Sequence, residues 1–164
     1  MDFGALQCTP AQPGCADCPL ASRCLALAAG TVAERPVKQT KTKVRDRWFN
    51  YLHVTCGDRT LLRRRGEGDI WQGLYEFPMI ETDRAADFSE LTDSEEFRTL
   101  LDGVEWRLLR SVAMPKHQLS HQTLHAVFHR IEISFPVDFP SVPTATLGDY
   151  AVPRLIDRYL DRQP

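Results

Sequence analysis

The sequence contains 164 residues, of which 43% are apolar and 26% are charged, and this composition excludes disordered and fibrous proteins. The formal net charge of −2 excludes a uniformly basic nucleic-acid-binding protein but leaves room for a locally basic surface. No window reaches the roughly 18 to 20 apolar residues of a membrane span, and the N-terminus lacks the basic start and apolar run of a signal peptide. We therefore expect a cytoplasmic protein without membrane contact.

Four of the five cysteines lie within the first 24 residues, which is not the spread expected of a disulfide framework. Cys8, Cys15, Cys18 and Cys24 follow the spacing C-x6-C-x2-C-x5-C. Thiolates this close together repel one another unless a metal centre takes up their charge. A zinc ribbon has two C-x2-C pairs about 15 to 20 residues apart. This chain has one such pair, so the spacing favours an iron–sulfur cluster over zinc.

The residues around these cysteines resemble those of a known DNA-repair family. Asp2–Ala5 reads D-F-G-A before the first cysteine, and Pro19–Leu20 follows the third, as in the 4Fe–4S loop of endonuclease-III-like DNA glycosylases. The resemblance implies a 4Fe–4S cluster bound by Cys8, Cys15, Cys18 and Cys24, with zinc, or an empty site in a truncated chain, as the alternative. That family places its DNA-gripping helices and catalytic residues before the loop, so we expect the N-terminal catalytic domain to be missing from this chain.

Residues 1–30 are the first predicted segment, in which residues 1–6 end a helix and residues 25–29 form a short helix that Gly30 terminates. Residues 31–47 are the predicted interdomain connector, with a proline, spaced lysines and almost no apolar residue. Between Glu34 and Arg65 the sequence has ten basic and three acidic residues. Such a segment suits a polyanionic partner, and a merely solvated linker is the alternative.

Residues 48–164 are the predicted second domain. Apolar strand-like runs over 48–55 and 60–65, on either side of a turn at Gly57–Asp58, predict a β-hairpin. Amphipathic patterns predict helices over 94–101 and 153–162, and residues 105–113 and 123–133 are predicted strands. This order predicts an α+β fold in which a mixed sheet lies between helices.

One string within this domain resembles a second family. Residues 73–78 read G-L-Y-E-F-P, similar to the G-L-W-E-F-P that precedes the Nudix box of MutT-like pyrophosphohydrolases. The box itself, R-E-x-x-E-E, is missing downstream. That box supplies the carboxylates that hold magnesium on a pyrophosphate, and Glu90, Glu95 and Glu96 have the wrong spacing for it. The expected fold is therefore a Nudix-like mixed β-sheet flanked by helices, preceded by the four-cysteine loop and the basic linker.

An iron–sulfur loop, a basic connector and a Nudix-like domain without its box resemble, together, the MutY-type adenine DNA glycosylases. The resemblance implies the C-terminal part of an A/G-specific adenine DNA glycosylase of base excision repair, which recognises 8-oxoguanine opposite adenine in double-stranded DNA. The chain alone is expected to be inactive, because the family's catalytic residues precede the cysteine loop. Two alternatives remain open: a stand-alone Nudix-like nucleotide hydrolase and a zinc-dependent nucleic-acid adaptor.

In the MutY-type family a phenylalanine-serine-histidine motif reads the lesion. The corresponding stretch here is Lys116–Gln122, K-H-Q-L-S-H-Q, in which leucine replaces the phenylalanine. By resemblance, Ser120 reads the oxidised base, with His121 beside it and Lys116 or His117 close to a phosphate. The implied binding set is Ser120, His121, Leu119, Gln118, Lys116 and His117.

The histidines of this region also allow a different interpretation. His117, His121, His125 and His129 recur every four residues, and on a helix they would form a stripe that could bind zinc. The apolar residues between and after the last two histidines favour a loop followed by a strand. We therefore expect His125 and His129 to occupy ordinary positions in a sheet.

Overall fold

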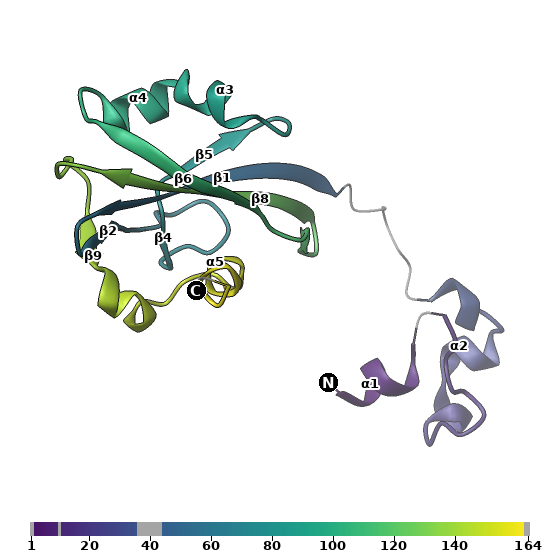
Figure 1. Cartoon of the computed structure of the whole chain (residues 1–164). Coiled ribbons are helices and arrows are strands. Elements are labelled where there is room, and N and C mark those ends of the chain that lie inside the picture. The colour runs from purple at the N-terminus through teal and green to yellow at the C-terminus, as the bar shows by residue number, and fades with distance from the viewer. Residues whose placement is uncertain (1, 10, 36–43, 163–164) are drawn as a thin grey trace. The chain divides into compact units, whose positions relative to one another are not determined.

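The computed structural model describes residues 2–9, 11–35 and 44–162, and the chain forms two compact units, Met1–Lys43 and Val44–Pro164 (Figure 1). The middle of the predicted connector, residues 36–43 with its three lysines, lies outside the described residues. No helix in the described ranges is long and apolar enough to cross a membrane.

The first unit consists of short helices around the cysteine loop. Helix α1 spans Asp2–Gln7 and α2 spans Leu25–Ala28, with 3-10 turns at Ala21–Arg23 and Val32–Glu34. Gly30 follows α2 with a φ of 69°, a left-handed conformation that glycine adopts without steric cost. The two predicted helical segments and the glycine stop are thus confirmed.

The second unit is built on a seven-stranded sheet of mixed direction. Its strands are β1 Arg45–Cys56, β2 Arg59–Leu61, β5 Met79–Thr82, β6 Trp106–Ala113, β7 His117–Gln118, β8 Gln122–Ile133 and β9 Ser141–Pro143. The order is β6-β8-β1-β2-β9, while β5 pairs with β1 and β7 with β8. Only the β1–β8 pair in this sheet is parallel. A separate ribbon joins β3 Arg63–Arg64 to β4 Tyr75–Glu76.

Helices cover both faces of this sheet, as the expected α+β fold requires. Helices α3, Phe88–Thr92, and α4, Glu95–Leu101, lie on one face, and α5, Arg154–Leu160, lies on the other (Figure 1). Each face has its own hydrophobic cluster. The central strand β1 supplies alternate residues to both clusters, Phe49 and Tyr51 to the α5 side and Leu52 and Val54 to the α3–α4 side, as a strand buried on both faces must.

The structure differs from the predicted element boundaries in two places. Strand β1 begins at Arg45 rather than at residue 48, so the last three residues of the predicted connector belong to the sheet; Arg47 is held there by ion pairs with Asp69 and Glu81. The predicted strand over 60–65 is divided at Leu62, whose N–H donates to Pro140 O. Beyond that point the chain pairs with β4 instead of continuing the main sheet.

Candidate nucleic-acid interface

The predicted recognition residues form the tip of a β-hairpin. Strand β7 pairs antiparallel with the start of β8, and Leu119 N–H donates to Gln122 O at 2.8 Å. This bond places Ser120 and His121 at the tip, where both are exposed. The turn therefore presents a serine and a histidine to solvent. It continues into β8, the strand that pairs in parallel with β1.

The neighbouring polar residues are exposed on the same hairpin. Lys116 and Gln118 are exposed. The Gln118 amide is tied to the turn, because its Nε2 donates to Leu119 O at 3.2 Å and its Oε1 accepts from Thr123 Oγ1 at 3.0 Å. Gln118 therefore braces the tip, and the exposed Lys116 places a positive charge beside it.

The two remaining predicted residues lie on the inner side of the hairpin. Leu119 is half-buried and packs against the α5-side hydrophobic cluster. His117 is also half-buried, with its ring edge-to-face on Trp71 at a centroid distance of 5.9 Å. Burial and the nearby Arg158 hold the pKa of His117 below its usual value of 6.5. This shift disfavours the charged imidazole, so His117 is a weaker candidate for a phosphate contact than the exposed Lys116.

The start of β1 holds the hairpin next to its tip. Arg45 N–H donates to His121 O at 3.0 Å, and the Arg47 guanidinium donates from Nη1 to Gln122 Oε1 at 3.0 Å. The parallel register aligns Arg45 with Gln122. The basic connector consequently enters the domain next to the recognition tip, and the Arg45 side chain is 73% exposed there.

A network of ion pairs fixes Arg47 in turn. Its guanidinium donates to both carboxylate oxygens of Asp69, at 2.7 and 2.8 Å, and to both of Glu81, at 2.7 and 2.6 Å. Such bidentate geometry is the strongest arrangement of this pair type. The hydrogen bond from Arg47 is the main reason that the pKa of Asp69 falls to about 2. Asp69 also accepts from Arg65, which contacts the buried Glu76.

The sequence alone does not predict the ion pairs of Arg47 with Asp69 and Glu81. Arg47 was read as the end of a connector, although its place directly before the apolar run of β1 was a signal that it could belong to the strand. Its partners Asp69 and Glu81 lie 22 and 34 residues away, and no local pattern marks them.

The four cysteines line one cavity of the first unit. Cys8, Cys15, Cys18 and Cys24 surround it together with Gln7, Gly14, Ala21 and Leu27. All four thiols are free. Among the described residues, no group of three or more histidine, cysteine or acidic side chains is arranged to hold a single metal ion.

The histidine stripe does not form, because its residues lie on a hairpin and a strand. His125 stacks on Trp48 at 4.8 Å and its Nε2 lies 2.7 Å from Asp46 Oδ1. His129 is buried, and its Nδ1 lies 2.8 Å from Ser111 Oγ. Both therefore have the sheet positions expected from the sequence.

The amino-acid sequence was compared with a family model and with known proteins. The sequence model of the NUDIX domain matches residues 50–162. The chain is 26% identical, over 148 residues, to an adenine DNA glycosylase of Buchnera aphidicola, covering 85% of this chain and 38% of that protein. It is 31% identical, over 101 residues, to an adenine DNA glycosylase of Arabidopsis thaliana, covering 53% of this chain and 16% of that protein. The chain thus spans well under half of either relative.

A solved structure agrees on the fold. The MutT protein of Methanosarcina mazei Go1 superposes with a TM-score of 0.56 at 14% identity, over 74% of this chain and 95% of that one. At this identity the similarity establishes the architecture alone. The mixed sheet between helices predicted from the sequence is therefore confirmed.

Proposed function

Because the chain belongs to the NUDIX domain family, and this domain resembles the C-terminal domain of MutY-type adenine DNA glycosylases, we propose that it recognises 8-oxoguanine opposite adenine in double-stranded DNA. The observation that carries the proposal is the exposed hairpin tip with Ser120 and His121. The tip is braced from below by Arg47 and lies beside the entry of the basic connector.

Ser120 suits the chemistry of the oxidised base. Guanine presents N7 as an acceptor in the major groove, whereas 8-oxoguanine presents an N7–H donor and an additional oxygen at C8. A serine hydroxyl can accept from the first and donate to the second. Because the hydroxyl is exposed at the tip, it can approach a base edge without rearrangement of the sheet.

The charges around the tip suit the DNA backbone. Lys116 is exposed directly before β7, and Arg45 is exposed where β1 begins. Cations at these two places can each neutralise a phosphate, a contact that contributes affinity without sequence preference. We therefore divide the work between Ser120, which distinguishes bases, and the cations, which hold the duplex.

Removal of adenine is assigned to residues outside the described domain, and we assign no catalytic residue to this chain. The alternative activity, magnesium-dependent nucleotide hydrolysis, needs the R-E-x-x-E-E box. The acidic residues of helix α4 are the adjacent Glu95 and Glu96, which do not have the spacing of that box. Binding of the lesion is thus the function that these residues support best.

The cysteine loop is proposed to hold a 4Fe–4S cluster through Cys8, Cys15, Cys18 and Cys24. When bound, the cluster would cross-link the short helices of the first unit, and four thiolates would replace a hydrophobic core there. Anaerobically purified protein is expected to be brown and to contain iron and acid-labile sulfide. Zinc at one equivalent without sulfide in such a preparation would contradict this assignment.

The base-reading role is tested by measuring the binding of this chain to 8-oxoguanine:adenine and guanine:adenine duplexes across a salt series. Ser120→Ala is expected to reduce the preference for the oxidised duplex by about 1 kcal/mol, or up to about 3 kcal/mol if the lost hydroxyl leaves a buried group unpaired. Ser134→Ala, at an exposed serine after the far end of β8, is the matched control and should leave the preference unchanged.

Lys116→Ala separates the two proposed roles in the same assay. It is expected to weaken both duplexes equally and to lower the salt slope by about 1. An unchanged preference in Ser120→Ala, with both duplexes weakened alike, would contradict base reading by this residue and would move that role to Gln118 or Gln122.

A further inference from the structure

A second cavity lies on the opposite side of the domain's sheet from α5, between α4, the start of β5 and the loop before β9. Its volume is about 470 Å³, within the range of sites that hold small ligands or single anchoring side chains. Leu52, Pro78, Ile80 and Leu100 form much of its apolar lining. None of the predicted recognition residues lines it, so its role is separate from that of the hairpin.

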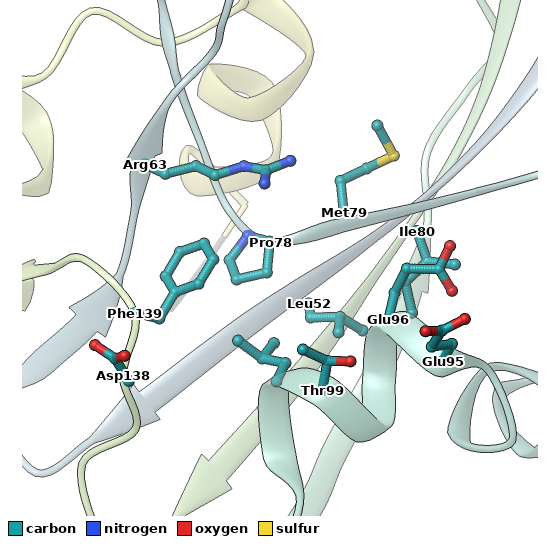
Figure 2. A pocket seen from close by; sticks show the side chains of 11 residues that line it. Leu52, Arg63, Pro78, Met79, Ile80, Glu95, Glu96, Thr99, Asp138 and Phe139 are labelled. Carbon is teal, nitrogen blue, oxygen red and sulfur yellow. The ribbon is translucent and has the colours of Figure 1, made fainter.

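Carboxylates stand on both sides of this cavity. Figure 2 shows Glu95 and Glu96 on one side, and Asp138 with the ring of Phe139 on the other. All three acidic residues are exposed. Within the described part of the chain, none of their carboxylates forms a hydrogen bond or an ion pair. The cavity therefore has three uncompensated negative charges around an apolar interior.

The one cation that lines the cavity is already paired. Arg63 donates to Glu76 Oε1 from Nε at 3.3 Å and from Nη2 at 3.2 Å, and its guanidinium lies 6.0 Å from the centroid of the Phe139 ring. Glu76 is buried, so releasing Arg63 toward an anion would remove one partner from a buried carboxylate. The unpaired carboxylates therefore give the rim of the cavity a net negative charge, which favours a cationic ligand over a phosphate.

We propose that this cavity binds an arginine or lysine side chain presented by an extended peptide of a partner protein. The charged group would lie between the carboxylates on the two sides, and its methylene stem would cover the apolar interior, as long basic side chains do. The cavity is larger than one side chain, so aliphatic neighbours in the peptide would fill the remainder.

The test uses the tripeptide Ac-Leu-Arg-Leu-NH2 and its citrulline analogue, which keeps the shape of arginine and removes its charge. Binding is measured by NMR titration of the whole chain. The arginine peptide is expected to shift the amide signals of α4 and of residues 138–139, and to bind about fivefold more tightly than the citrulline peptide. Equal binding of the two peptides, or shifts confined to other parts of the domain, would overturn the proposal.

Variants locate the charge that is responsible. Glu95→Gln with Glu96→Gln is expected to weaken the arginine peptide by about threefold to tenfold. The control, Glu90→Gln with Asp93→Asn on and beside α3, removes the same net charge outside the cavity and should change the affinity by less than about twofold. An equal loss in both pairs would reduce the effect to general electrostatics and overturn the site.

Two further ligands exclude other occupants. Agmatine, a small guanidinium compound, binding as tightly as the peptide would overturn the assignment to a peptide. ADP with magnesium producing the same shifts at a lower concentration would overturn the assignment to a cation, and would return the cavity to nucleotide binding. Weaker binding of both than of the arginine peptide is the expected result.

Discussion

Two buried histidines, His53 and His129, make the stability of this domain sensitive to pH. His53 stacks on Phe77 at 4.5 Å, and its Nδ1 lies 2.9 Å from the hydroxyl of Tyr159. Burial, helped by Arg130 and Arg110, lowers the pKa of His53 to about 4, and burial alone lowers that of His129 to about 4. Both rings are therefore neutral in the folded protein at pH 7.

Stability is expected to fall as the pH decreases from 6.5 toward 4. In that window the unfolded chain binds protons on both histidines while the folded chain does not, so protonation favours unfolding. Each histidine contributes about 3 kcal/mol or less over the full window. Urea unfolding at pH 7.5, 6 and 5 measures the effect.

Variants assign this pH dependence to particular residues. His53→Gln and His129→Gln should each flatten the slope of unfolding free energy against pH, even though each lowers the stability at pH 7.5. His121→Gln, at the exposed hairpin tip, is the control and should keep the wild-type slope. A slope that stays unchanged in both buried variants would refute the assignment.

At the scale of single elements, α4 depends on one capping residue. Ser94 precedes the helix, and its Oγ accepts from Phe97 N–H at 3.2 Å and donates to Leu91 O at 2.7 Å. The acidic Glu95 and Glu96 follow in the first turn, where the helix dipole stabilises negative charge. The buried Phe97 and Leu101 then attach the helix to the sheet.

Ser94→Ala is expected to lower the free energy of unfolding by about 1 kcal/mol, because it leaves the Phe97 N–H without its cap. Chemical denaturation followed by circular dichroism measures the change. Ser89→Ala, an exposed position within α3, replaces the same side chain where its hydroxyl caps nothing and should change stability by less than about 0.5 kcal/mol. Equal effects of the two substitutions would show that the cap is dispensable.

At the scale of the whole molecule, the two units rest on different kinds of stabilisation. Among the side chains of the first unit that the structure describes, none is buried. The second contains both hydrophobic clusters and the ion-pair network. Folding of the second unit should therefore not require the first, whereas the first should depend on what its cysteines bind.

A fragment of residues 44–164 is accordingly expected to unfold cooperatively, with a free energy within about 0.5 kcal/mol of that of the same transition in the whole chain. Urea unfolding of the fragment and of the whole chain, monitored by tryptophan fluorescence, makes the comparison, because all three tryptophans lie in this unit. A fragment that is unfolded in buffer would show that the cysteine unit supports the second one.

What the sequence determined by itself was encoded over short distances. The cysteine spacing, the amphipathic pattern over residues 94–101 and the glycine after α2 each act within a few residues, so these local elements could be predicted directly. The apolar residues between and after His125 and His129 favoured a strand over a histidine-bearing helix, and β8 is that strand. The G-L-Y-E-F-P string, through its resemblance, identified the fold that the comparisons confirm.

What only the tertiary structure decided involves residues far apart in the chain. Arg47 meets Asp69, Glu81 and Gln122 across 22, 34 and 75 residues, and these contacts set where β1 begins and how the hairpin is supported. The turn of Leu119 into the core and the convergence of α4 with residues 138–139 on one cavity have the same origin. Such arrangements follow from sheet register and packing, which a one-dimensional pattern does not contain, because each depends on which distant segments become neighbours.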